Sequence, residues 1–169
     1  SVLEKRERFK RLRGLPQYLA SFASALATFR PEPYRISIQE SDGESWEILE
    51  DRTILCTVTV GPSIGGGFMV NPEASPFDGR LDLFFVEALG LAKIVRFVPK
   101  VVRGTHQDIP EIKLRRIWRG TIERPDNAPF HFELDGERMP DPVSRLEIDL
   151  VESALPVTVA PPGEGASPR

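Results

Sequence analysis

The stretch at residues 61–82, GPSIGGGFMVNPEASPFDGRLD, holds the densest turn signals of the chain. Its three consecutive glycines, at positions 65–67, permit positive φ angles and a close approach of the backbone to a ligand. The Asp78-Gly79 pair then predicts a tight turn into an apolar run. The residues leave two interpretations open: a bent, bulged strand followed by a turn, or a wall of bare backbone beside a binding site.

Apolar, β-branched runs flank this stretch on both sides. Residues 53–60 predict a buried central strand before it, and residues 81–86 predict another strand after it. Alternating patterns predict further strands elsewhere, at residues 35–38, 46–49, 112–118, 121–123, 130–134, 146–151 and 157–159. The expected fold is therefore mainly β (α+β), a β-sandwich with about two helices.

Apolar residues at three- and four-residue steps predict the two helices. The first covers residues 15–30 and docks on its own domain or, alternatively, contacts a membrane. The second covers residues 89–102, where Pro99 should shorten or kink it.

Charge is distributed unevenly along the chain. The formal net charge is -3, yet six basic and two acidic residues fall within the first thirteen. The net negative charge of the remaining residues argues against nucleic-acid binding. The basic residues 1–13, which precede the amphipathic helix at residues 15–30, could instead contact anionic lipid. We expect a basic linker or helix start at residues 1–14, a β-sandwich domain at residues 15–159, and a disordered tail rich in Pro, Gly and Ala at residues 160–169.

The composition favours a cytoplasmic protein. No secretory signal is visible, and the apolar runs are far shorter than the roughly 18 residues that a membrane span requires. The single cysteine, Cys56, excludes an internal disulfide and is expected to be a buried, inert thiol.

Asp135 and Glu137 are the best candidates for chemistry. If a strand continues through them, both carboxylates point to one face about 6.6 Å apart, and one could then accept a proton from a hydroxyl. The alternative is an ordinary Asp-Gly hairpin turn. Elsewhere, His106, His131 and one cysteine give no zinc-ligand spacing, and no Walker A loop or nucleophile elbow occurs.

Five motifs in order resemble the diacylglycerol kinase family of lipid kinases, which includes YegS-like proteins and, more distantly, sphingosine and ceramide kinases. The motifs are Gly61-Pro62 with Gly65-Gly66-Gly67, Pro72-Glu73-Ala74, Asp78-Gly79-x-Leu81-Asp82, Arg103-Gly104-Thr105-His106 up to Pro110, and Asp135-Gly136-Glu137. The resemblance spans about Lys10 to Val159. It implies the C-terminal domain of a diacylglycerol/NAD kinase-like enzyme, which closes over a cleft shared with an N-terminal nucleotide lobe. The Gly-Gly-Asp-Gly-Thr motif of that lobe is absent from this sequence.

The resemblance implies transfer of the ATP γ-phosphate, with Mg²⁺, to the hydroxyl of a diacylglycerol-like lipid. Asp135 would be the general base and Glu137 would lie beside it in the catalytic carboxylate cluster. The expected cofactor-binding residues are Gly65, Gly66 and Gly67. The domain alone should be inactive, because the groups that position the phosphates belong to the other lobe.

A structural Mg²⁺ is also implied at the Asp-Gly turn. The Asp78 side chain and the backbone carbonyls of Ser75 and Arg80 would be its ligands, and such oxygen ligands suit Mg²⁺. The sequence departs from the family at Val60, where an Asn often precedes the glycine.

The expected partners are a lipid substrate, the nucleotide-binding lobe of the same protein and, peripherally, the inner membrane surface. The exposed edges of a sandwich would also allow a homodimer. Two other functions remain open. One is a non-catalytic β-sandwich module that binds anionic membranes, and the other is a hydrolase built on Asp135 and Glu137.

Overall fold

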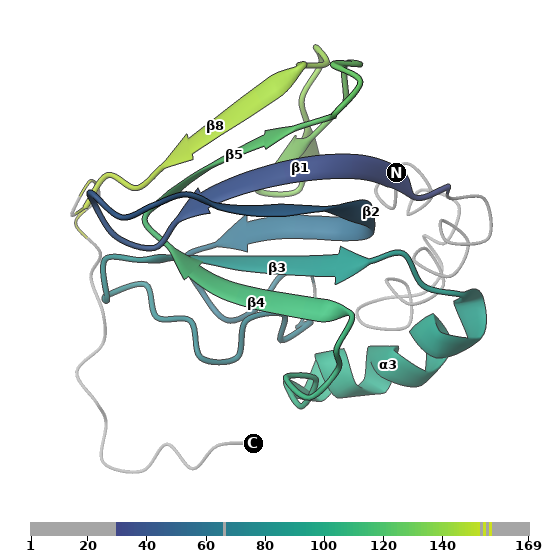
Figure 1. The fold of residues 1–169 in the computed structure, drawn as a ribbon. Helices are drawn as coiled ribbons and strands as arrows, with labels where there is room; N and C mark the ends of the chain where they lie inside the picture. Colours follow the sequence, from purple (N-terminus) through teal and green to yellow (C-terminus); the bar gives the residue numbers. More distant parts are fainter. Residues whose placement is uncertain (1–29, 66, 153, 155, 157–169) are drawn as a thin grey trace, which may run out of the picture.

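The computed structural model describes residues 30–65, 67–152, 154 and 156. These residues form antiparallel strands and one helix (Figure 1), which confirms the prediction of a mainly β fold. The elements are β1 (Glu32–Gln39), β2 (Glu47–Thr59), β3 (Leu81–Glu87), α3 (Leu91–Arg103), β4 (Ile112–Ile117), β5 (Arg119–Glu123), β6 (Glu133–Leu134), β7 (Glu137–Arg138) and β8 (Arg145–Asp149). The predictions for residues 1–29 and 157–169 lie outside the described part.

Six strands form one coiled sheet in the order β4-β3-β2-β1-β5-β8. Strands β4 and β5 are separated only by Trp118, yet β4 pairs with β3 and β5 pairs with β1. The Trp118 N–H donates to the Gln39 carbonyl over 2.7 Å and fixes the bend to the end of β1. The bent segment formed by β4, Trp118 and β5 therefore pairs with β3 at one end and with β1 at the other. The sheet is strongly curved as a result, and its concave face encloses part of the core (Figure 1).

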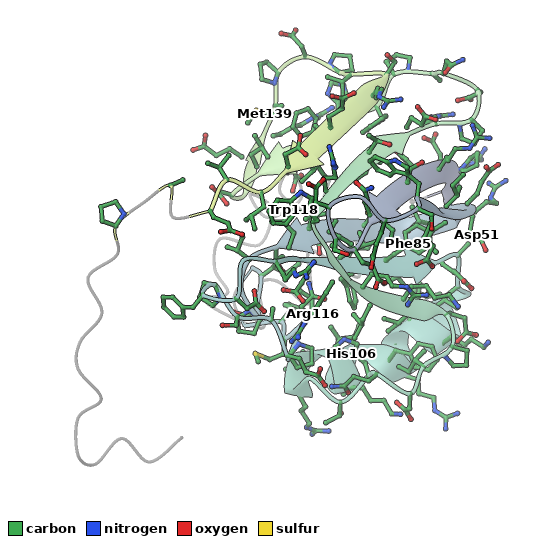
Figure 2. All side chains as sticks on the ribbon, turned by 60° about the vertical axis from the view of Figure 1, so that its left-hand side comes forward. Asp51, Phe85, His106, Arg116, Trp118 and Met139 are labelled. Atoms are coloured by element: carbon green, nitrogen blue, oxygen red, sulfur yellow. The ribbon has the colours of Figure 1, made fainter. Side chains whose placement is uncertain are left out.

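Strand β3 is buried on both faces, so its alternating side chains enter two separate clusters. The inner cluster lies within the curl of the sheet and includes Phe85 (Figure 2), with Ile36, Ile38, Leu81, Leu83 and Ile117. The outer cluster lies between the sheet, α3 and the loop that joins β2 to β3, and consists of Val70, Phe84, Val86, Ile109 and Ile112. Cys56, which was expected to be buried, is partly buried against the inner cluster, and this burial raises the pKa of its thiol to about 12.

Strand β2 is longer than predicted. The expected strands at residues 46–49 and 53–60 form one strand that continues through Glu50, Asp51 and Arg52. These charged residues pair in register with β1, and the Arg35 Nε lies 2.8 Å from a carboxylate oxygen of Glu50. Cross-strand ion pairing at this exposed end therefore stabilises residues 50–52 as strand, although their charged sequence does not suggest one.

The prediction was that Pro99 shortens or kinks helix α3, and the structure shows that Pro99 does not shorten it. The helix continues for four residues beyond the proline, to Arg103. Proline removes the bond to the carbonyl of Val95, but both residues are exposed, so water can solvate that carbonyl. The helix ends at Gly104, whose φ is 68°, and the N–H groups of Gly104 and Thr105 donate to the carbonyls of Val101 and Lys100 in a Schellman motif. Within the described residues, no helix is both long and apolar enough to cross a bilayer.

Candidate functional site

The Gly-rich part of the 61–82 stretch forms a tight reversal instead of a bulged strand. Ile64 and Phe68 exchange backbone hydrogen bonds of 3.0 and 3.1 Å across it. Gly65 and Gly67 have φ angles of 41° and 103°, which disfavour any other residue. A Cβ on Gly67 would meet no atom within 4 Å, so the glycine is required by the backbone conformation and not by close packing. Gly66 lies outside the described residues.

Asn71 joins this reversal to the sheet. Its side-chain amide donates to Thr59 Oγ1 over 2.9 Å and to the Asp82 carbonyl over 3.0 Å. Its backbone N–H donates to the Pro62 carbonyl over 3.1 Å. Only 4% of Asn71 is exposed, so these bonds form in a buried setting and hold the loop between the end of β2 and the start of β3. The Asn71-Pro72 dipeptide is a turn signal in the sequence, but it gives no indication of this bridging role.

The Asp78-Gly79 turn forms as predicted. The carboxylate of Asp78 accepts the Arg80 N–H over 3.0 Å, Gly79 has a φ of 68°, and β3 begins directly afterwards at Leu81. The Asp78 N–H donates to the Ser75 carbonyl over 3.4 Å. The three predicted metal ligands, Ser75, Asp78 and Arg80, therefore belong to one compact turn.

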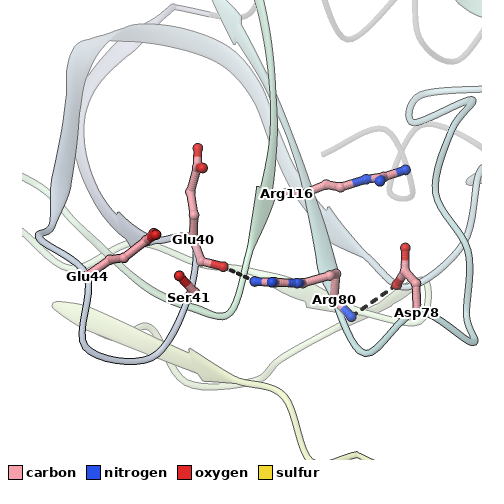
Figure 3. A pocket seen from close by; sticks show the side chains of 6 residues that line it. All are labelled: Glu40, Ser41, Glu44, Asp78, Arg80 and Arg116. Atoms are coloured by element: carbon pink, nitrogen blue, oxygen red, sulfur yellow. Dashed lines mark hydrogen bonds between the residues drawn. The ribbon is translucent and has the colours of Figure 1, made fainter.

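A cavity of about 390 Å³ lies beside this turn (Figure 3). The Arg80 guanidinium crosses it and donates to the Glu40 carbonyl. Its lining combines three carboxylates and two guanidinium groups from the β1–β2 loop, the Asp78 turn and β4, namely Glu40, Ser41, Glu44, Asp78, Arg80 and Arg116. Glu40, Ser41, Glu44 and Arg116 were not among the sequence candidates, because strand pairing and the bend at Trp118 bring these distant segments together.

Asp82 is a buried carboxylate next to the turn. Only 5% of the residue is exposed, and its Oδ2 has no hydrogen-bond partner within the described part of the chain. Burial raises its pKa, Asp78 and Glu73 raise it further, and the positive charge of Arg116, with Nε 3.8 Å from Oδ1, partly opposes these effects. The Asp82 carboxylate behind the Asp78 turn is therefore buried and only partly compensated by Arg116.

Asp135 and Glu137 lie in a separate two-stranded sheet formed by β6 and β7. Asp135 and Gly136 have φ angles of 49° and 84°, the positive pair that a two-residue hairpin of type I′ requires. The turn interpretation is therefore the observed one, and the two carboxylates do not share a face of a continuous strand. Both side chains are exposed at the tip of the hairpin.

His106 contacts the middle of the 61–82 loop at Val70. It is fully buried, its Nε2 lies 2.9 Å from the Val70 carbonyl, and its ring meets Phe84 edge-on with centroids 5.4 Å apart. Figure 2 shows it beside the end of α3. Burial lowers the pKa of its imidazole, and its Nδ1 has no partner within the described residues. A neutral His106 that donates from Nε2 thus pins the loop to the helix end.

The comparisons with known proteins agree with this architecture. The sequence model of the family described as the YegS C-terminal NAD kinase beta sandwich-like domain matches residues 1–159, so the chain belongs to this family. A diacylglycerol kinase of Mycobacterium tuberculosis (strain ATCC 25618 / H37Rv) is 27% identical over 124 residues, which cover 73% of this chain and 38% of the relative. A diacylglycerol kinase of Bacillus subtilis (strain 168) is 28% identical over 133 residues, or 77% and 40% of the two chains.

Solved structures show the same fold. The crystal structure of a diacylglycerol kinase from Bacillus anthracis str. Sterne has a TM-score of 0.52 and 22% identity, and the match covers 75% of this chain and 43% of that one. A second crystal structure from the same organism reaches a TM-score of 0.55 over 84% of this chain. The matches thus cover between 38% and 45% of the length of these relatives and structures.

Proposed function

We propose that this chain is the C-terminal, substrate-side domain of an ATP- and Mg²⁺-dependent lipid kinase that phosphorylates the hydroxyl of a diacylglycerol-like lipid. The observation that carries the proposal is the membership of residues 1–159 in the YegS C-terminal domain family, whose matching relatives are named diacylglycerol kinases. The sequence motifs Asp78-Gly79 and Asp135-Gly136-Glu137, which resemble those of the same family, give further support.

Asp135 is the proposed general base. A base must reach within hydrogen-bond distance of the hydroxyl from which it takes a proton. A carboxylate at the exposed tip of a hairpin is accessible to a lipid headgroup that approaches from outside the domain. Glu137 follows Asp135 across one glycine, and we propose that its negative charge favours the proton transfer.

The Asp78 turn is suited to Mg²⁺. The carboxylate of Asp78 and the carbonyls of Ser75 and Arg80 are hard oxygen donors. No cluster of three or more acidic, His or Cys side chains forms a metal site within the described residues, so one side chain with backbone carbonyls and water would supply the ligands. Asp82 Oδ2 behind the turn has no hydrogen-bond partner within the described residues, while Arg116 lies near the other oxygen of the same carboxylate. Bound Mg²⁺ would add positive charge beside the carboxylates of Asp78 and Asp82.

The proposed reaction needs a second lobe. Phosphoryl transfer depends on groups that hold the nucleotide phosphates, and we propose that an N-terminal nucleotide-binding lobe supplies them. Gly65, Gly66 and Gly67 would then lie at the nucleotide. The domain would act at the inner membrane surface, where its substrate resides.

A transfer assay with radiolabelled ATP and diacylglycerol in mixed micelles tests the proposal. A polypeptide that joins this domain to its nucleotide-binding lobe is expected to label the lipid only with Mg²⁺ present, whereas residues 1–169 alone should label nothing. Labelling by residues 1–169 alone would refute the two-lobe requirement. A two-lobe polypeptide that binds ATP but phosphorylates no lipid hydroxyl would refute the kinase assignment.

A further inference from the structure

A second carboxylate lies against the Asp78-Gly79 turn, and it comes from a distant part of the chain. Glu152 follows the end of β8 by three residues. A Cβ on Gly79 would lie 3.1 Å from Oε1 of Glu152 and 3.5 Å from its Cδ. The segment that follows β8 therefore places a carboxylate oxygen at the backbone of the turn that is proposed to hold Mg²⁺.

The arginine of the turn does not neutralise this pair of carboxylates. The Arg80 guanidinium extends away from Asp78 and donates to the Glu40 carbonyl on the other side of the cavity (Figure 3). Within the described residues, neither Asp78 nor Glu152 forms an ion pair. Two exposed carboxylates thus share one turn, while the cation of that turn binds another acceptor.

Arg116 on the neighbouring strand β4 is also engaged. It donates to the Glu73 carbonyl over 2.8 Å, and its Nε lies 3.8 Å from Oδ1 of Asp82. Only 5% of Asp82 is exposed, and its other oxygen, Oδ2, has no hydrogen-bond partner within the described residues. Arg116 therefore partly compensates the buried carboxylate behind the turn, and Asp78 and Glu152 in front of it are accessible to a cation from solution.

We propose that Glu152 is a second side-chain ligand of the divalent cation at the Asp78 turn. This inference rests on the proposed Mg²⁺ site and extends it to a segment outside the turn. A carboxylate is the hard oxygen donor that Mg²⁺ prefers, and Glu152 would take the place of one water. Since the carboxylate already lies at the turn, little conformational entropy is lost when it binds the ion. Binding of the cation would then fix the segment after β8 to the start of β3.

Mg²⁺ titrations of the full 169-residue chain at constant ionic strength test the proposal. The rise of the melting temperature with Mg²⁺ concentration gives the Kd of the site. Loss of one negative charge about 4 Å from a divalent ion weakens the attraction even in water, so Glu152→Gln should raise this Kd about tenfold. Glu147→Gln is the matched control, because the exposed carboxylate of Glu147 on β8 pairs with Arg145, and it should keep the wild-type Kd.

Cleavage by a glutamate-specific protease provides a second readout. Mg²⁺ should slow cleavage after Glu152, because a side chain that binds the ion cannot enter the specificity pocket of the protease. Cleavage after Glu164 is the internal control, and Mg²⁺ should leave its rate unchanged. Asp78→Asn should abolish the protection at Glu152.

The outcomes separate this inference from the proposed function. Equal Kd values for the wild type and Glu152→Gln, with no Mg²⁺ response in Asp78→Asn, would overturn the role of Glu152 and leave the Asp78 site intact. A tenfold loss in Glu147→Gln as well would show that general negative charge attracts the ion, and would also overturn it. A wild-type chain that does not respond to Mg²⁺ would overturn both the site and the role of Glu152. Neither readout uses kinase activity, so a failed transfer assay would bear on the proposed function alone.

Discussion

Asp78 is the residue at which the proposed metal site can be tested most simply. Its carboxylate already accepts the Arg80 N–H, so the turn is formed by the chain itself. Mg²⁺ at ten times its dissociation constant should stabilise the folded state by about 1.4 kcal/mol. We expect Asp78→Asn to abolish this gain in a thermal melt.

Asp141→Asn is the matched control, because Asp141 is an exposed aspartate in the bend before β8, away from the turn. This control should keep the full response to Mg²⁺. If Asp78→Asn responded to Mg²⁺ as strongly as the wild type, the ion would bind elsewhere.

His106 should make stability depend on pH. Burial lowers the pKa of its imidazole below the ordinary 6.5, whereas the unfolded chain keeps that ordinary value. Between the two values the unfolded state binds more protons, so the contribution to stability is complete above about pH 6.5 and is lost as the pH falls toward the folded pKa. The loss is at most about 1.4 kcal/mol for each pH unit.

Urea unfolding at pH 7.5 and 5.5 measures this effect. His106→Gln, whose amide can still donate to the Val70 carbonyl, should show a smaller difference between the two pH values than the wild type. His131→Gln is the control, because His131 is exposed and should leave the wild-type difference unchanged. An equal pH response in His106→Gln would show that other groups cause it.

Among the secondary-structure elements, α3 depends on Gly104 for its junction with the 61–82 loop. An alanine Cβ there would lie 3.0 Å from the Cβ of Pro72 and 3.3 Å from that of Met69. Gly43 has a comparable φ of 82°, but its Cβ would meet nothing within 4 Å. Gly43→Ala should therefore cost roughly 1–2 kcal/mol in the free energy of unfolding, from backbone strain alone.

Gly104→Ala should cost more, by about 1–3 kcal/mol, because overpacking is added to the same strain. Chemical denaturation of both variants separates the two contributions. If both variants lost the same free energy of unfolding, the end of α3 and the loop would move apart at no cost. The close packing of Gly104 against Pro72 and Met69 would then not contribute to stability.

Sequence patterns predicted the elements that have a clear apolar run or a characteristic turn sequence. The apolar run at β3 and the Asp78-Gly79 turn were both predicted, because alternation and turn chemistry are local properties. The single long β2 was not predicted, since Glu50 to Arg52 are stabilised by the partner strand β1. Helix α3 continues past Pro99 at an exposed position, where water can solvate the carbonyl that loses its bond, and no local sequence pattern reveals that exposure.

On the scale of the whole molecule, the sequence predicted a mainly β domain of one family, but it could not predict which residues meet. The Asp78 cavity combines the β1–β2 loop with a turn and with β4, and the coil of the sheet at Trp118 creates that meeting. The Asp135 hairpin was foreseen as one of two alternatives, because Asp-Gly pairs serve both in strands and in turns. The roles of Gly65, Gly67, Asp135 and Glu137 remain predictions.

The turnover number for phosphoryl transfer to diacylglycerol in Asp135→Asn tests the proposed function most directly. It is measured in the two-lobe polypeptide, with Asp141→Asn as control. The amide keeps the shape of the side chain but cannot accept the hydroxyl proton, so kcat should fall by about 10²–10⁴ while KM for ATP is unchanged. Full activity in Asp135→Asn, together with unchanged activity in the control, would contradict the assignment of Asp135 as the general base of a lipid kinase.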